Sequence, residues 1–356
     1  MGETTILIKN IFHMLCYAFH VLRQRNYADI ETEEFQHVQD MFAAILIRGI
    51  AQQLKQGLYK TYVTYKDQLN TVRGKLNLLE TKKMQSQRIQ RVDCSFDEMS
   101  EDNDFNRILR ATAFAMIHSK EVAKKHKNEL KRELLLFSKV SVIDLSAVRW
   151  NMLLIHRNNH SYEMLMNICR MAWMSLLPST DHGNKRFSLF DEESMPLLYE
   201  KFILEYYRQH YPMLHASDRP IRWDISEETD PSMIRMLPGM HSDIMLRYAG
   251  KTMIIDAKFY QHSLANYMGK QMLHSANLYQ IFTYVKNEDK KQSGNVSGLL
   301  LYARTTEAIP PVLDAILGGN RIQVSALDLN SSFREISKTL DRIVDDAFSR
   351  TCRKTI

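Results

Sequence analysis

Apolar residues recur every three or four positions in several stretches of this sequence, a spacing typical of amphipathic helices. In the first of them the apolar positions are Ile8, Ile11, Phe12, Leu15, Phe19 and Leu22. The same spacing predicts helices over residues 6–22, 33–56, 105–119, 162–177, 269–287 and 333–348, and one that begins at Met195. Runs rich in β-branched and aromatic residues predict strands within 58–79, with a bend at Gly74, and over 91–96, 242–248, 251–260, 298–303 and 321–327.

The order of these elements predicts two domains, which is also the expectation for 356 residues. Pro178 ends a helical pattern, and the turn-rich residues that follow it predict a linker over 178–194. We expect an N-terminal α+β domain over 1–177, made of helices with a small β region. Residues 195–356 are expected to form an α/β domain with a mixed central sheet flanked by helices. The acidic run at 97–104 is expected to open the helix that follows it.

The most informative stretch is a predicted hairpin between residues 242 and 260. If residues 249–250 form a two-residue loop, Tyr248 faces Lys251 across the ladder. Five positions further along each strand, Asp243 then faces Asp256. Directly opposed residues share a face of the sheet, so the two carboxylates are expected to lie together.

Lys258 lies two residues after Asp256, and the strand period of two places both on the same face. Facing carboxylates repel each other unless a positive charge lies between them. Mg²⁺ prefers one or two carboxylates plus waters and phosphate oxygens, so Asp243 and Asp256 are the candidate metal ligands. Lys258 would orient the attacking water or stabilise charge on a phosphorane. The alternative is a salt-bridged strand with a solvated edge.

The arrangement of Asp243, Asp256 and Lys258 resembles that of the PD-(D/E)xK nucleases, with Ser242 where the pattern has proline. The resemblance implies a PD-(D/E)xK restriction-endonuclease-like fold for the second domain. It also implies hydrolysis of phosphodiester bonds with Mg²⁺ or, in its place, Mn²⁺.

In that fold, a glutamate on the helix before the hairpin often completes the metal or water network. On the helical wheel of the segment that starts at Met195, Glu205 borders the apolar face, whereas Glu200 lies opposite it. We therefore expect Glu205 to assist catalysis, with a carboxylate at the rim of the helix as the alternative.

Gln280 and Tyr284 are four residues apart on the predicted helix 269–287, hence neighbours on one face. The pair resembles a motif of RecB-like nucleases, which implies that both residues position the DNA substrate or a water. His156 and His160 also have a helical spacing, but no third ligand lies nearby, so we do not expect a metal there.

Across almost the whole chain, the order of short motifs resembles the McrC family, the nuclease subunits of McrBC-type modification-dependent restriction systems. The residues that carry the resemblance lie in 9–19, 73–75, 96–108, 197–202, 243–260 and 277–280. The resemblance implies an N-terminal region that docks on a hexameric ring of AAA+ GTPase subunits of the McrB type and stimulates GTP hydrolysis. It implies a C-terminal nuclease that cuts double-stranded DNA containing methylcytosine.

The sequence itself has no nucleotide-binding loop. Gly74-Lys75, Gly250-Lys251 and Gly269-Lys270 all lack a glycine five positions earlier, so there is no Walker A motif. The chain is therefore not expected to be its own motor. The basic and aromatic segment 58–79 is the first candidate for contacts with a partner, although a half-buried sheet with a solvated basic edge also explains it.

The composition is consistent with this interpretation but does not discriminate between the possible functions. The chain carries 47 Lys and Arg against 41 Asp and Glu, a net charge of +6 that suits a polyanionic partner. No apolar run approaches the roughly 18 residues of a membrane span, and no signal peptide is recognisable, so we expect a cytoplasmic protein. The four cysteines are far apart and predict neither a zinc site nor disulfides. Two other functions stay open: a non-catalytic coupling subunit of the motor, and a stand-alone RecB-like DNA-repair nuclease.

Overall fold

The computed structural model describes residues 8–19, 30, 33–157, 159–176, 194–226, 228–259, 264–267, 270–304 and 311–348. They fall into two compact units, one made of residues 33–189 and one that joins residues 1–32 to 190–356. Apart from Ser194, the expected linker 178–194 lies outside the described residues.

The division differs from the expected 1–177 and 195–356 because α1 (Ile8–Ala18) belongs to the C-terminal unit. There α1 packs against α8 (Ser194–His210), and the ring of Tyr17 contacts those of Phe202 and Tyr206. An apolar stripe predicts that a helix is covered but not by which helix, so sequence order assigned α1 to the wrong unit.

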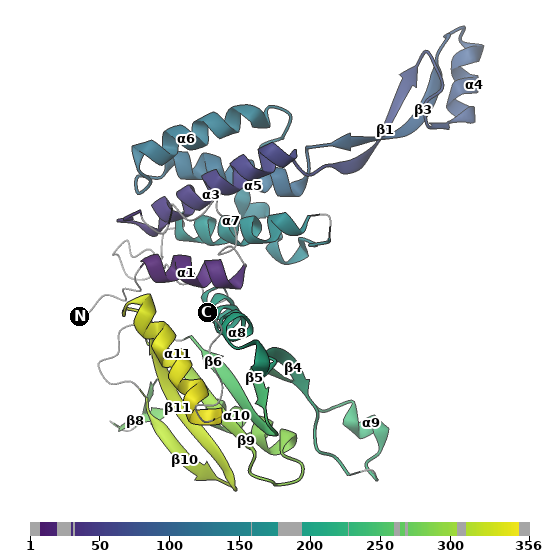
Figure 1. Cartoon of the computed structure of the whole chain (residues 1–356). Coiled ribbons are helices and arrows are strands. Elements are labelled where there is room, and N and C mark those ends of the chain that lie inside the picture. Colours follow the sequence, from purple (N-terminus) through teal and green to yellow (C-terminus); the bar gives the residue numbers. More distant parts are fainter. Residues whose placement is uncertain are drawn as a thin grey trace. The chain divides into compact units, whose positions relative to one another are not determined.

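Four helices form the body of the helical unit, residues 33–189 (Figure 1). They are α3 (Val38–Gln56), α5 (Asp104–His118), α6 (Lys124–Leu134) and α7 (Glu163–Leu176). Short 3₁₀ turns follow α6 at Leu135–Phe137, Leu145–Ala147, Trp150–Met152 and His160–Tyr162. The predicted α+β composition of this part of the chain is confirmed, because a small sheet accompanies the helices.

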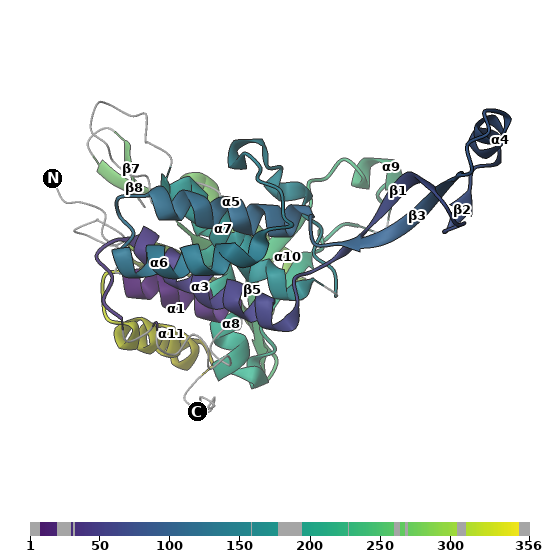
Figure 2. The same cartoon turned by 90° about the horizontal axis from the view of Figure 1, so that it is seen from above.

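This sheet forms an arm, defined here as residues 61–100. The arm pairs β1 (Thr61–Leu69) antiparallel with β3 (Val92–Ser100), and β2 (Lys75–Leu76) pairs with β3. α4 (Leu78–Ser86) lies at the far end of the arm, which runs outward from the helices in both Figure 1 and Figure 2.

The predicted bend at Gly74 is confirmed. Its φ is +69°, and a Cβ there would collide with the backbone of Ser95 and Phe96. The strands expected within 58–79 end earlier than predicted, because Leu78 and Leu79 begin α4. Of the acidic run 97–104, residues 97–100 extend β3, and the next helix begins only at Asp104. Pairing with β1 continues through Ser100, so the strand ladder overrides the preference of acidic residues for a helix start.

The C-terminal unit is built on a six-stranded sheet in the order β10-β11-β9-β6-β5-β4. Its strands are β4 (Ser217–Ile221), β5 (Met240–Tyr248), β6 (Lys251–Lys258), β9 (Val296–Arg304), β10 (Leu313–Leu317) and β11 (Asn320–Asp328). β6, β9 and β11 are parallel and the other pairs are antiparallel, which confirms a mixed sheet.

The remaining elements of this unit are helices and a small hairpin. They are α9 (Pro231–Ile234), α10 (Ser275–Glu288), α11 (Phe333–Phe348), the 3₁₀ turn Pro212–Leu214, and the hairpin of β7 (Leu264–Tyr267) and β8 (Lys270–Leu273). The helix expected over 269–287 therefore begins at Ser275, because residues 270–273 pair as a strand.

Gly298 brings α10 close to the sheet. A Cβ at this position would lie 2.8 Å from side-chain atoms of Ile281 and Val285 on α10, so only glycine permits the approach. Gln280 precedes Ile281 on the same helix, and β6 pairs with β9 directly beside Gly298. The packing of this helix thus brings Gln280 over β6.

The structure also bears on the expectations for membrane spans and for the cysteines. No helix in the described ranges is long and apolar enough to cross a membrane. Cys16, Cys94 and Cys169 are buried thiols, and Cys352 lies outside the described residues.

Candidate active site

The hairpin of β5 and β6 has the predicted register. Both residues of the 249–250 turn have positive φ, 48° and 77°, as a tight two-residue loop requires. Tyr248 pairs with Lys251, and the ladder continues without a shift to the pair of Ile244 and Ile255, the residues next to Asp243 and Asp256. The same register places Asp243 opposite Asp256.

The two aspartates and Lys258 form a tight cluster. An Asp243 oxygen accepts a hydrogen bond of 2.8 Å from the backbone N–H of Ala257. Asp256 is only 1% exposed and lies 2.9 Å from the Lys258 ammonium through its Oδ2 atom. Its other oxygen, Oδ1, is buried and has no hydrogen-bond partner among the described residues. A buried carboxylate oxygen with a free lone pair is a ready ligand for a cation.

Both carboxyl groups bind a proton more tightly than usual. Burial raises the pKa of Asp243 to about 8, and the charges of Asp256 and Glu200 act in the same direction. Burial also raises the pKa of Asp256, against the opposing effect of Lys258. The site therefore lacks positive charge, since one ammonium does not balance the carboxylates around it.

Lys258 is held by a chain of hydrogen bonds from α10. Its ammonium donates to Oε1 of Gln280 at 3.2 Å, and the Gln280 amide nitrogen donates to the hydroxyl of Tyr284 at 2.8 Å. The structure thus brings Gln280 and Tyr284 together with the cluster. Their hydrogen bonds orient Lys258, and the expected positioning of a substrate or water by these two residues stays a prediction.

On α8, the structure places Glu200 beside the cluster, whereas the role expected for Glu205 stays a prediction. Glu200 interacts electrostatically with Lys258, Asp256 and Asp243, and burial raises its pKa, with Asp256 acting in the same direction and Lys258 opposing. The carboxylate of Glu205 instead accepts a hydrogen bond of 2.7 Å from Arg208. Five residues separate the two glutamates, which turns them about 140° apart on the helix.

The helical wheel is a poor guide to which side of α8 faces the site, because this helix is buried around most of its circumference. Tyr199 on α8 contacts Phe259 after β6, whereas Phe202 contacts Tyr17 on α1. A helix packed on two sides has no single apolar face that identifies the side toward the site. Tyr199, directly before Glu200, contacts the residue that follows β6, and no pattern in the sequence identifies this side of the helix.

The residues present fit a small divalent cation that prefers oxygen ligands. The described ranges contain no cluster of three or more His, Cys, Asp and Glu side chains arranged around a metal position. Zinc favours such closed sets, whereas Mg²⁺ is typically held by one or two carboxylates, waters and substrate oxygens. Asp243 and Asp256 supply those two carboxylates, and the free lone pair on Asp256 supports the fit.

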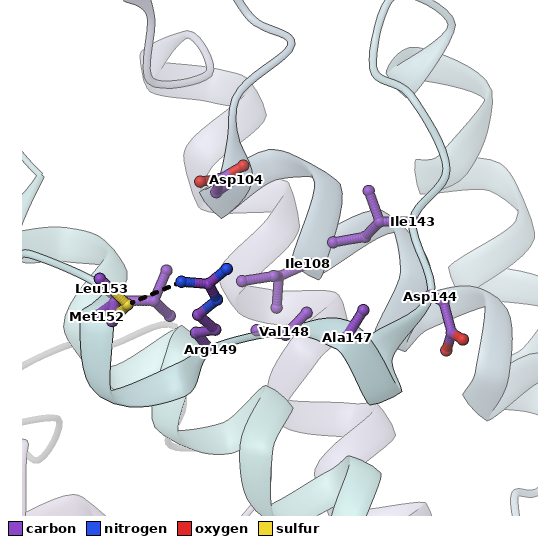
Figure 3. Close-up of a pocket in the computed structure, with 9 residues that line it drawn as sticks. All are labelled: Asp104, Ile108, Ile143, Asp144, Ala147, Val148, Arg149, Met152 and Leu153. Carbon is purple, nitrogen blue, oxygen red and sulfur yellow. Dashed lines mark hydrogen bonds between the residues drawn. The ribbon is translucent and has the colours of Figure 1, made fainter.

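A separate pocket of about 640 Å³ lies within the helical unit (Figure 3). It contains none of the predicted site residues. Ile108, Ile143 and Val148 contribute apolar walls, while Asp104 and Arg149 carry charges. The guanidinium of Arg149 points to the sulfur of Met152 at 3.7 Å. The pocket has no pair of carboxylates facing each other, so the hairpin cluster is the better candidate for hydrolytic chemistry.

Comparison with known families supports an assignment for most of the chain. Residues 4–303 match the family model described as "McrBC 5-methylcytosine restriction system component". Among curated proteins, the "Type IV methyl-directed restriction enzyme EcoKMcrBC" of Escherichia coli K12 is 26% identical over 311 residues. That match covers 87% of this chain and 89% of the relative.

Solved structures show a similar fold. A chain in the "Refined half-complex from tetradecameric assembly of Thermococcus gammatolerans McrB AAA+ hexamers with bound McrC" matches with a TM-score of 0.53 and 15% identity. The match covers 95% of this chain and 75% of that one. At this identity the comparison concerns the fold alone.

Proposed function

Because the chain belongs to the family of McrBC 5-methylcytosine restriction system components, we propose that it is the nuclease subunit of such a system. In this proposal it is a Mg²⁺-dependent endonuclease with a PD-(D/E)xK fold that cuts double-stranded DNA containing methylcytosine. It does so when docked on an AAA+ GTPase ring of the McrB type, whose GTP hydrolysis it stimulates.

The observation that carries the proposal is the meeting of Asp243, Asp256 and Lys258 at one place, where Asp256 is buried and the other two are partly buried. Burying a carboxylate beside a second carboxylate costs free energy that a purely structural cluster would not need. Strongly perturbed carboxyl pKa values are typical of functional sites. The methyl-directed restriction activity in the name of the E. coli relative agrees with DNA as the substrate.

Asp243 and Asp256 would hold the metal ion in this proposal. When bound, Mg²⁺ would supply a Lewis acid that favours deprotonation of a water and neutralises charge on the phosphate. The hydrogen bond from Ala257 fixes the side chain of Asp243 in place, so the two carboxylates are oriented before a ligand arrives.

Lys258 would hold the attacking water and stabilise negative charge on the phosphate in the transition state. Its ammonium lies 2.9 Å from Asp256, and Gln280 fixes its direction. Glu200 would accept a proton from the water, because its raised pKa brings it nearer to the working pH.

The arm is the proposed contact with the GTPase ring. At its far end, Val72, Leu78 and Leu79 are exposed, and such apolar side chains are expected to be covered by a partner. The solved chain with a similar fold comes from a complex of McrB AAA+ hexamers with bound McrC, which agrees with a ring as that partner. The absence of a Walker A motif from the sequence also agrees with a motor in another chain.

The test is cleavage of a methylated plasmid with Mg²⁺ by the chain alone, and by the chain with the GTPase encoded beside it and GTP. Asp256→Asn serves as the control. We expect the plasmid to be cut only when the partner and GTP are both present, and we expect the Asp256→Asn variant not to cut it. Cutting of unmodified DNA by the chain alone would favour a repair nuclease instead. Stimulated GTP hydrolysis without any cutting would favour a coupling subunit.

A further inference from the structure

Helix α6 and its flanks carry a large share of the positive charge of this chain. Residues 120–139 hold seven Lys and Arg against three Glu, a net charge of +4. The whole chain has a net charge of +6. Two thirds of the excess positive charge is therefore gathered in 20 of the 356 residues.

The inner side of α6 is held firmly against the helical unit. Asp40 on α3 accepts a hydrogen bond of 2.8 Å from the backbone N–H of Ala123, and Nδ1 of the buried His126 lies 2.6 Å from the same oxygen. Leu130 is also buried, and α6 packs against α3 and α5. Figure 1 shows α6 at the border of the helical unit. These contacts fix which side of α6 is turned to solvent.

The outer side of α6 is polar throughout, and most of it is cationic. With about 100° per residue, the positions that lie opposite His126 and Leu130 are 124, 125, 128, 131 and 132. The exposed side chains at these positions are Lys124, Lys125, Asn128, Lys131 and Arg132. The two glutamates of the helix, Glu129 and Glu133, are half-buried on its flank. The outer side therefore presents four cations and no carboxylate.

Three of these four cations are not neutralised within the unit. Lys125 pairs with Glu33 at 2.8 Å. Lys124, Lys131 and Arg132 form no ion pair with any residue that the structure describes. A cluster of cations that is not compensated creates a positive potential, which attracts a polyanion.

The residue types on this side suit nucleic acid better than a protein partner. Protein interfaces are centred on apolar and aromatic anchors, and lysine is depleted from them. Contacts with DNA phosphates are instead made largely by Lys and Arg, and they carry no sequence information. The exposed Leu135 and Leu136 follow only after α6 has ended, so the outer side of the helix itself offers no apolar anchor.

The spacing of the cations also fits a DNA strand. Lys124 and Arg132 are eight residues apart, which corresponds to about 12 Å along a helix. Each strand of a DNA duplex has one phosphate about every 3.4 Å along the axis, so this length faces about three or four phosphates. Each of the three uncompensated cations can therefore meet a phosphate of its own.

We propose that the outer side of α6 is a second DNA-binding surface, which holds the phosphate backbone of a duplex without reading its sequence. The inference rests on the proposed function in taking DNA as the polyanion. It adds a contact in the helical unit to the carboxylate cluster of the C-terminal unit.

Binding of a fluorescent duplex to the full chain tests this surface. The probe is an unmethylated duplex of about 20 base pairs, longer than α6, and the chain carries Asp256→Asn in EDTA so that no cutting interferes. The α6 variant combines Lys124→Gln, Lys131→Gln and Arg132→Gln. We expect its affinity at low salt to be lower by about tenfold or more, and the slope of log affinity against log salt to shrink by about 0.9 per lost contact. Glutamine is a good helix former, so the melting temperature should be unchanged.

The matched control combines Arg334→Gln, Lys338→Gln and Arg342→Gln. These residues are exposed cations spaced four apart on α11, so the control removes the same charge from another helix. Helix α11 also carries four carboxylates, which balance its cations. The control should therefore leave the affinity and its salt dependence nearly unchanged.

The DNA-binding surface is refuted if the unsubstituted chain does not bind the duplex, or if the α6 variant binds it with unchanged affinity and salt dependence. Equal losses in the α6 variant and the control would show only an effect of total charge and would also refute it. Unchanged DNA affinity with a loss of GTPase stimulation would place an acidic protein partner on α6 instead. None of these readouts requires cutting, so failure of the nuclease proposal is recognised separately in the cleavage test.

Discussion

The carboxylate of Asp243 on β5 accepts a hydrogen bond from the backbone amide of Ala257, the residue between Asp256 and Lys258 on β6. This bond ties the first carboxylate to the strand that carries the other two groups. The relative positions of the cluster are therefore set by the hairpin itself, and a small change at Asp243 alters chemistry without altering the strand pairing.

We predict that Asp243→Asn and Asp256→Asn each lower DNA cleavage at least about 100-fold, because each removes a metal-ligand charge. An asparagine oxygen at position 243 can still accept the bond from Ala257, so the fold should persist. Cleavage assays, thermal unfolding and GTPase stimulation measured on the same preparations check this. Cleavage at the unsubstituted rate in either variant would remove the assignment.

The pKa of Asp243 predicts an unusual pH dependence of stability in the metal-free protein. The folded state keeps a proton on this carboxyl up to about pH 8, whereas its ordinary value is 3.8. Between these values the folded state binds more protons than the unfolded state, so the free energy of unfolding falls as pH rises. Asp243→Asn should flatten that slope and be more stable at high pH by on the order of several kcal/mol.

Urea unfolding with EDTA, from about pH 5 to about pH 8, measures the effect. Added Mg²⁺ should reduce the difference between the two proteins, because a bound cation stabilises the ionised carboxylates. The prediction would be contradicted if the free energy of unfolding rose with pH over this range in the unsubstituted chain but not in Asp243→Asn.

The hairpin could be predicted from the sequence because its determinants are local. The turn at 249–250 fixes the register, and the strand period then places Asp243, Asp256 and Lys258 on one face. The spacing of Gln280 and Tyr284 was equally local, and the structure joins them in one hydrogen-bond chain.

Contacts between distant elements could not be predicted in this way. Helix α1 joins the C-terminal unit through packing on α8, which no local pattern encodes. The same packing buries both sides of α8, so the helical wheel could not show that Glu200 lies beside the cluster. Short strands such as β4 and β10 were missed because five residues carry too little alternation.

Glu200→Gln and Glu205→Gln should have opposite effects. Glu200→Gln removes the cost of burying a carboxylate charge, which outweighs the attraction to Lys258, so stability should rise slightly while cleavage falls about tenfold or more. Glu205→Gln weakens the hydrogen bond that the buried Glu205 accepts from the half-exposed Arg208, so stability should fall by about 1 kcal/mol while cleavage below the melting temperature is kept.

Thermal unfolding and cleavage rates of the two variants, measured side by side, test this contrast. The pH profile of cleavage adds a readout for Glu200, since loss of a proton acceptor should remove its acidic limb. If Glu205→Gln abolishes cleavage in a folded protein and Glu200→Gln does not, the sequence-based assignment is restored.

Substitutions at the far end of the arm should reduce stimulation of the GTPase without unfolding the chain. Leu78 and Leu79 are exposed on α4, at the far end of the arm. The double substitution Leu78→Ser and Leu79→Ser should therefore leave the melting temperature unchanged. If the arm docks on the ring, stimulation of GTP hydrolysis should fall about tenfold or more, because buried apolar anchors dominate such interfaces. Leu135→Ser is the matched control, since Leu135 is equally exposed in the same unit but outside the arm. Unchanged GTPase stimulation by the α4 variant would place the contact with the ring elsewhere on the chain.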